Sequence, residues 1–260
     1  LSFLLRFWKQ STEKRSLAMV EKTLSRMAEG GICDPLGGGF HRYATDSGWF
    51  LPHFEKMLYD QAILSKTYLE AYQETRKKGY AEQAKAIFEY AMRDLRGPEG
   101  AFYSAEDADS LEPKAGRKRE GAFYVWEKSE IRDLLGEEAG EIFSFVYGVR
   151  EEGNVSNDPQ GEFPRKNVLS LAQTPEEAGK KFSKSLSEVE RLLEDSRKRL
   201  FEARSKRPRP HRDDKILTDW NGLMISSLAF GSRVLGEPRY QEAARQAADF
   251  ILEKLVRKDG

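Results

Sequence analysis

Apolar residues recur at helical spacing along most of the chain. Met19, Leu24 and Met27 form one such stripe, and a longer stripe runs from Met57 to Tyr72. Positions three or four apart share one face of an α-helix, so each stripe predicts an amphipathic helix. At residues 174–177 the order Thr-Pro-Glu-Glu supplies a cap, a proline at the first helical position and acids in the first turn. The helices predicted on these grounds cover residues 19–28, 56–77, 80–95, 129–135, 137–147, 174–205, 217–235 and 239–255.

Three segments lack this spacing. Residues 34–52 are rich in glycine and aromatic residues, and we predict a loop there. Residues 148–171 are rich in Gly, Asn, Pro and charge, and a loop of that length inside a domain is usually functional or disordered. The short apolar runs 101–103 and 122–126 flank a polar insertion. We interpret them as the two strands of a small β-hairpin with a long loop.

The chain also repeats itself weakly. A shift of 160 residues lays residues 60–95 over residues 220–255 without a gap, and Tyr80 then matches Tyr240. In both copies a buried helix is followed by a short turn and an amphipathic helix that starts at tyrosine. The sequence therefore predicts a helical hairpin used at least twice. Repeated hairpins bury their faces on one another in a solenoid or a closed ring.

Composition narrows the classes of protein. Lys plus Arg number 43 and Asp plus Glu number 43, which argues against a nucleic-acid-binding protein with its basic excess. Aromatic residues reach 11%, which together with zero net charge argues against disorder. The single cysteine, Cys33, excludes a disulfide within these 260 residues. No apolar run approaches the roughly 20 residues of a membrane helix, and we expect a cytoplasmic protein without membrane contact.

Three polar stretches carry the candidate chemistry. The first is Gly37-Gly38-Gly39-Phe40-His41-Arg42-Tyr43, which continues through Trp49 to Pro52-His53-Phe54-Glu55. Its glycines allow tight turns or the close approach of a ligand, and two histidines, an arginine, two acids and several aromatic rings lie within 20 residues. This pattern predicts the rim of a concave site, or a structured loop whose polar groups satisfy one another.

The second stretch places Glu106, Asp107 and Asp109 at the end of a predicted strand. A calcium loop fails here, because EF-hand spacing needs Gly and Glu where Glu112 and Lys118 stand. A carboxylate site and a plain charged turn both stay open.

The third stretch runs from His211 through Asp214 to Asn221, at the start of a buried helix. The 160-residue shift places Asp213 over His53, so the first and third stretches would lie at equivalent ends of their hairpins and converge on one pocket. The triple glycine follows no clear strand and does not fit a nucleotide-binding fingerprint. No His-x-x-x-His pair is present, so we predict no metal and no cofactor.

These stretches carry a resemblance. The sequences of residues 34–43, 52–61 and 213–223 closely resemble the thioredoxin-domain-containing family of YyaL type, whose animal members are called spermatogenesis-associated proteins. Residues 104–110, 120–126 and 161–167 are similar to that family as well. The resemblance implies an all-α fold, an (α/α)6 toroid of the six-hairpin glycosidase type that is similar to N-acylglucosamine 2-epimerases, with a small β-hairpin insertion. It also implies a thioredoxin-like domain of the same protein as a partner.

The ends of the sequence bear on this expectation. Residues 1–8 read as the middle of an element, and residues 257–260 read as a turn before a further element. We therefore expect residues 1–260 to form part of one toroid domain that is incomplete at both ends.

The resemblance and the polar stretches together predict a carbohydrate-active toroid with a small sugar or glycoside as its ligand. A glycosidase needs two carboxyl groups, about 5–5.5 Å apart if it retains configuration and about 6.5–9.5 Å apart if it inverts. An epimerase would instead use histidine as base and acid next to a carbonyl, and we expect His53 and His211 to point into one cavity. The predicted catalytic residues are His53, Glu55, Asp107, Asp109, His211, Asp214 and Asp219. The predicted substrate-binding residues are His41, Arg42, Tyr43, Trp49, Phe54, Trp126, Lys215, Trp220 and Asn221, whose aromatic members would be platforms for a sugar ring.

A second hypothesis is non-catalytic. The toroid would be a binding or scaffold module that presents a ligand or client to the thioredoxin-like domain. The same polar residues would then form a recognition surface or a structural network.

Overall fold

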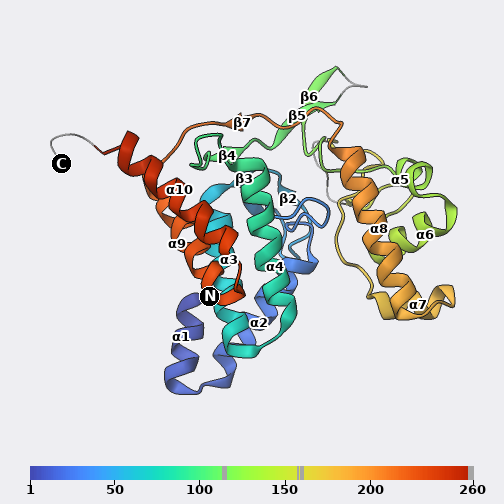
Figure 1. Cartoon of the computed structure of the whole chain (residues 1–260). Helices are drawn as coiled ribbons and strands as arrows, with labels where there is room; N and C mark the ends of the chain where they lie inside the picture. The colour runs from blue at the N-terminus through green and yellow to red at the C-terminus, as the bar shows by residue number, and fades with distance from the viewer. Residues whose placement is uncertain (113–115, 157, 159–160, 257–260) are drawn as a thin grey trace.

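The computed structural model describes residues 1–112, 116–156, 158 and 161–256 of the chain (Figure 1). Ten α-helices carry most of these residues, and the strands among them are short pairs. The predicted all-α class with a small β insertion is confirmed. The turn predicted at residues 257–260 lies outside the described residues.

Two helical hairpins form the centre of the fold. Helices α3 (Leu58–Thr75) and α4 (Lys78–Tyr90) make the first hairpin, and α9 (Thr218–Leu235) and α10 (Pro238–Lys254) make the second. Both helices of the second hairpin start where the 160-residue shift predicts. Helices α3 and α9 pack side by side, and α4 and α10 each pack on the inner helix of their own hairpin (Figure 1). Paired inner and outer helices of this kind are the building unit of the predicted α/α toroid.

Matching amide side chains fix the loops that lead into these hairpins. The buried amide of Gln61 accepts a hydrogen bond from the Phe40 N–H at 2.8 Å and donates to the Phe40 carbonyl at 2.7 Å. Asn221 makes the same pair of bonds with Phe102, at 2.8 and 2.9 Å. The shift matches residue 61 with residue 221, so the repeat extends from helix positions to a specific contact.

A third hairpin precedes these two. It consists of α1 (Ser2–Ser11) and α2 (Lys14–Glu29), and α1 lies against α3 through a Ser2–Thr67 hydroxyl contact at 3.2 Å and a Lys9–Glu74 ion pair at 2.7 Å. The sequence pattern did not predict helix α1. Helix α2 also starts five residues earlier than residue 19.

Four further helices pack around a second hydrophobic cluster that contains the fully buried Trp126. They are α5 (Lys128–Leu135), α6 (Glu137–Val146), α7 (Pro175–Phe182) and α8 (Leu186–Arg204). The single helix predicted over residues 174–205 is wrong. Ser183 adopts a left-handed conformation with φ +54°, and Ser185 then starts a new helix through a capping box with Glu188. Helix α8 contributes to this cluster through the buried side chains of Val189 and Leu200.

The strands connect the hairpins to this helical group. Short strands β3 (Lys56–Met57), β4 (Ala105–Glu106) and β7 (Arg212–Asp213) form one sheet in the order β3-β4-β7, and β1 (Tyr43–Ala44) pairs with β2 (Pro52–His53) inside the predicted loop 34–52. The β-hairpin lies inside the polar insertion and not at the two apolar runs where it was predicted. The polar insertion itself pairs, as β5 (Asp109–Glu112) with β6 (Arg117–Glu120), whereas Phe102 and Trp126 make isolated bridges to Arg96 and Asn167.

Asn221→Leu tests the matched amide contacts. The substitution leaves the buried N–H and carbonyl of Phe102 without partners, and each unsatisfied group costs about 1–3 kcal/mol. We expect the free energy of unfolding in urea to fall by at least about 2 kcal/mol. Ser226→Ala on the exposed side of the same helix is the control and should change stability by less than about 0.5 kcal/mol. Equal losses in the two variants would contradict the structural role of Asn221.

Candidate functional site

A cluster of polar residues around His53 lies where β1, β2 and β6 meet. We call Arg42, Tyr43, His53, Glu55 and Glu120 the His53 cluster. Strand pairing sets Tyr43 opposite His53, and the two rings stack with centroids 4.9 Å apart. The His53, Glu55 and Glu120 side chains are 26%, 24% and 28% exposed, so a ligand can reach them.

Both ring nitrogens of His53 face carboxylate oxygens. Nδ1 lies 2.7 Å from Oε1 of Glu120, and Nε2 lies 3.1 Å from Oε2 of Glu55. A neutral imidazole carries only one N–H and cannot donate to both acids. The geometry therefore requires one more proton, carried by the ring or by a carboxyl group. Arg42 donates a hydrogen bond to the same oxygen of Glu55, Oε2, at 2.8 Å.

An aromatic pair adjoins the cluster. The Tyr59 ring meets the Trp220 ring edge to face, with centroids 4.7 Å apart. The Arg42 guanidinium lies within interaction range of the Tyr59 hydroxyl as well as of Glu55. The starts of α3 and α9 therefore bring an aromatic surface to the edge of the His53 cluster.

The sheet β3-β4-β7 has two chemically different faces. Lys56 pairs with Glu106 across β3 and β4, and both side chains are buried, at 1% and 3% exposure. Because side chains alternate along a strand, Glu55, Asp107 and His211 belong to the opposite, open face. The Asp107 N–H donates to the His211 carbonyl at 2.8 Å, which continues the β4–β7 pairing by one residue.

On the buried face, Lys56 contacts the carboxylate of Asp34. Its Oδ1 accepts hydrogen bonds from the N–H groups of Leu36 and Gly37, both at 3.1 Å. Arg204 at the end of α8 binds both carboxylate oxygens at 2.8 Å, and Lys56 binds Oδ2 at 2.8 Å. A side chain on Gly37 would collide with the Arg204 guanidinium. We call Asp34, Lys56 and Arg204 the Asp34 network.

Aromatic rings and a second acid complete the surroundings of Lys56. Its ammonium donates to the Gly38 carbonyl at 2.8 Å and lies 4.3 and 5.0 Å from the ring centroids of Tyr90 and Tyr124. The Tyr90 hydroxyl donates to the buried Glu106 at 2.7 Å. The β3 strand is thereby held on its inner face by charge-assisted bonds and cation–π contacts.

Burial alone would raise the pKa of Asp34, but the cations of Arg204 and Lys56 hold it well below its usual range. Burial lowers the pKa of Lys56, and the negative charge of Asp34 opposes this effect. The three groups depend on one another, because a buried charge without its partner is strongly unfavourable.

Four of the predicted site residues come together in the His53 cluster, namely Arg42, Tyr43, His53 and Glu55. Trp220 lies beside them through its contact with Tyr59. Asp107 and His211 are neighbours on the open face of the sheet, and His211 is exposed. Lys215 is exposed and pairs with Asp213 at 2.7 Å. Asp109, Asp214 and Asp219 are all exposed.

Five other predicted site residues lie in or against the interior. Phe54 and Trp126 are buried in hydrophobic clusters, and Asn221 is engaged with Phe102. Trp49 packs on the core of the hairpins. His41 is 3% exposed, bonds the Phe54 carbonyl through Nδ1 at 3.0 Å and meets the rings of Phe54 and Tyr124 edge-on. These five residues are thus engaged in or against the core of the fold, and their predicted roles in a site stay predictions.

The sequence reasoning missed Glu120 and the Asp34 network. Glu120 stands 67 residues from His53, and Arg204 stands 170 residues from Asp34. The spacing of residues along the chain gave no sign of either contact. Asp34, Lys56 and Glu120 did occur in the stretches that carry the family resemblance, and this was the available signal.

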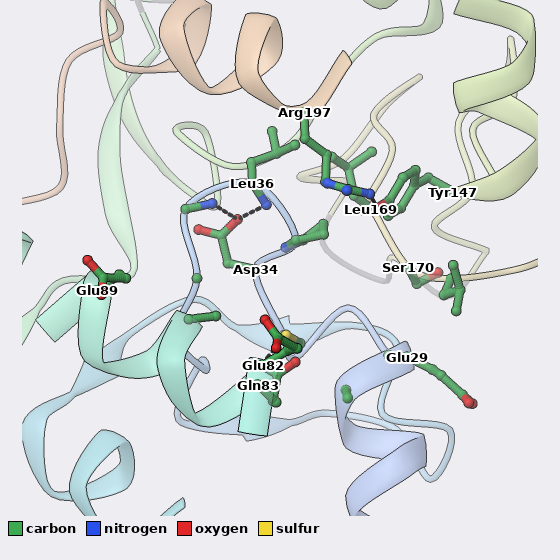
Figure 2. A pocket seen from close by; sticks show the side chains of 18 of the residues that line it. Glu29, Asp34, Leu36, Glu82, Gln83, Glu89, Tyr147, Leu169, Ser170 and Arg197 are labelled. Atoms are coloured by element: carbon green, nitrogen blue, oxygen red, sulfur yellow. Dashed lines mark hydrogen bonds between the residues drawn. The ribbon is translucent and has the colours of Figure 1, made fainter. Parts of the chain in front are cut away.

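A separate cleft of about 540 Å³ lies between α4 and the helical group that contains α6 and α8. Figure 2 shows Glu82 and Gln83 on one side, Tyr147 and Arg197 on the other, and Asp34 between them with its two backbone hydrogen bonds. The described residues that line this cleft do not include members of the His53 cluster.

The described residues also contain no group of three or more His, Cys, Asp or Glu side chains arranged for a metal ion. None of their helices has both the length and the apolar character that a membrane crossing needs.

Comparisons with known proteins give relatives at the level of sequence. No family model matches the chain. Human spermatogenesis-associated protein 20 is 42% identical over 96% of the chain, and an uncharacterized protein of Caenorhabditis elegans is 40% identical over the same share. The chain spans about a third of the length of these relatives, 34% and 36%. Among solved structures, cellobiose 2-epimerase from Bacillus thermoamylovorans aligns with 98% of this chain and 74% of its own, at 12% identity and a TM-score of 0.36. A sugar epimerase from a ruminal bacterium gives 13% identity and a TM-score of 0.37 with the same coverage.

His41 makes a pH-dependent contribution to stability. Burial lowers the pKa of its imidazole to about 3 from an ordinary value of 6.5. Between these values the unfolded chain binds a proton that the folded chain does not, so stability rises with pH across this window. As the pH falls from 6.5 to 4, the free energy of unfolding of the wild type relative to His41→Gln should fall by up to about 1.4 kcal/mol per pH unit.

Urea unfolding of both proteins at several pH values measures this difference. Groups that titrate in both proteins cancel in the comparison. A difference that stays constant between pH 4 and pH 7 would contradict a buried, neutral His41.

Proposed function

We propose that the chain belongs to the spermatogenesis-associated protein 20 family and that its His53 cluster is the acid–base centre of a carbohydrate-active domain. The observation that carries the proposal is the imidazole of His53 held between the carboxylates of Glu55 and Glu120 at a partly exposed edge. Such a chain of groups holds a transferable proton at the position that a substrate can reach.

The surroundings of His53 suit a sugar. Tyr43 and the Tyr59–Trp220 pair offer aromatic surfaces for the apolar face of a pyranose ring. Arg42 and Glu55 offer a donor and an acceptor for hydroxyl groups. Ligand sites commonly combine apolar and aromatic walls with a few placed polar groups in this way.

The arrangement favours proton transfer at carbon over glycoside hydrolysis. A glycosidase needs two carboxyl groups that flank the scissile bond with the substrate or water between them. Here the imidazole of His53 occupies the space between Glu55 and Glu120. His53 would take a proton from the carbon next to the carbonyl of an open-chain sugar and return it to that carbon or to its neighbour, an epimerase- or isomerase-like reaction. Glu120 would orient the ring through Nδ1.

The proposal uses one histidine. The structure leaves His211 exposed at the far strand of the sheet, and its participation stays a prediction. Asp107 is bonded through its backbone to His211 and is the carboxylate that we propose would link it to the His53 cluster.

The second candidate is a binding or scaffold role, and the cleft of about 540 Å³ favours it because it lies apart from the His53 cluster. In this case the module would present a ligand or client to the thioredoxin-like domain that the family resemblance implies. We further propose that residues 1–260 form part of one toroid domain, that the same protein carries the thioredoxin-like domain, and that the protein is cytoplasmic.

His53→Gln in the full-length protein tests the first candidate. Mannose, glucose and cellobiose are incubated in deuterated water, and proton NMR follows deuterium entry at the carbon next to the carbonyl. Loss of the acid–base group should lower the rate by about 10²–10⁴-fold. Lys198→Gln on the exposed face of α8 is the control and should keep the wild-type rate.

Full activity in His53→Gln would contradict the proposed centre. An equal loss in His211→Gln would extend the centre to both histidines. A wild-type protein that exchanges no deuterium into any of these sugars would favour the binding role.

A further inference from the structure

One oxygen of the Asp60 carboxyl group is buried without a hydrogen-bond partner among the described residues. Asp60 stands in the first turn of α3, one residue after Tyr59. Its Oδ2 is buried and makes no hydrogen bond to the described residues. A buried, unpaired carboxylate oxygen is costly, so its presence needs a reason.

The surroundings of Asp60 connect it to the His53 cluster. Arg42 is the charged group that acts on Asp60, and the same guanidinium binds Glu55 at 2.8 Å. Glu55 in turn lies 3.1 Å from His53. Tyr59 lies beside Arg42 and against Trp220. Asp60 and His53 are therefore connected through one arginine–glutamate pair.

The chemical environment of Asp60 favours its protonated form more than that of an exposed aspartate. Burial raises the pKa of its carboxyl to about 7, and the positive charge of Arg42 opposes this effect without overcoming it. The N-terminal turn of a helix also favours the ionised form, so burial outweighs two opposing influences. A carboxyl group in this state both donates and accepts protons near neutral pH.

We propose that Asp60 is the second proton-transfer group of the site and acts on the oxygen atoms of the substrate while His53 acts on its carbon atoms. This inference rests on the proposed function and names its substrate class as an open-chain sugar with a hydroxyl group next to its carbonyl.

The steps balance without another reagent. His53 takes the proton from the carbon next to the carbonyl as that C–H bond breaks. Asp60 gives its proton to the carbonyl oxygen as the new O–H bond forms, which leaves an enediol. Asp60 then removes a proton from either enediol oxygen, and His53 returns its proton to a carbon. Return through the same pair of atoms permits epimerisation, and return through the other pair interconverts aldose and ketose.

The pH dependence of kcat/KM tests the role of Asp60. Because Asp60 must be protonated to donate, wild-type kcat/KM should fall as the pH rises through about 7. Asp60→Asn in the full-length protein should lower kcat/KM by about 10²-fold or more and should lack this limb of the profile. Asp60→Glu should recover part of the rate.

The melting temperature of Asp60→Asn distinguishes a loss of catalysis from a loss of folding. Asn at this position places a neutral group where the carboxylate is unfavourable, so Asp60→Asn should melt at or above the wild-type temperature at pH 8. Carbon-13 NMR of labelled aspartate, with Asp60→Asn for assignment, should show a carboxyl group that titrates near pH 7.

Three results would overturn the inference. If wild type turns over a sugar and Asp60→Asn keeps its rate, Asp60 is not the donor while the proposed function stands. A carboxyl group of Asp60 that titrates near its ordinary value of 3.8 would exclude the role independently of any substrate. A wild-type protein without turnover on any sugar would overturn the proposed function and the assignment of Asp60 together.

Discussion

The buried carboxylate of Asp34 is the interaction on which the structure depends. It joins three segments that are far apart in the sequence: its own glycine-rich turn, β3 through Lys56, and the end of α8 through Arg204. Two cations and one anion with almost no exposure are stable only together, because removing one partner of a buried pair costs about 3–5 kcal/mol. The ion pairs of the Asp34 network therefore link the central hairpins to the helical group around Trp126.

This tie also determines what the open side of the sheet presents. Lys56 and Glu106 face inward, so the alternation of side chains turns Glu55, Asp107 and His211 outward. Glu55 then meets His53, and the β5–β6 hairpin brings Glu120 to the other ring nitrogen. A shift of β3 by one residue would reverse both faces at once. The ionic network on one face thus positions the acid–base groups on the other.

The sequence predicted those parts of the fold that local patterns encode. Helical periodicity and the 160-residue shift predicted both central hairpins, since a helix face needs only neighbours in sequence to be visible. The cap at Thr174 correctly marked the start of α7. The break at Ser183 was missed because the apolar stripe continues across it, and the β5–β6 hairpin was missed because its strands are polar.

The site residues Arg42, Tyr43, His53 and Glu55 were found together because they lie within one short stretch. Glu120 and Arg204 reach their partners only through tertiary structure. His41 and His53 look alike in the sequence, and burial alone separates the neutral core residue from the partly exposed one.

Histidine-selective nitrogen-15 NMR on the full-length protein tests the central claim most directly, with His53→Gln for assignment. If His53 is held between two carboxylates, its Nδ1 proton should be strongly hydrogen-bonded at neutral pH, and Nε2 should either carry a proton or accept one from Glu55. Glu120→Gln should weaken the Nδ1 signal, while the signals of His211 stay unchanged. A His53 ring whose N–H protons exchange with solvent as freely as those of the exposed His211 would contradict the account.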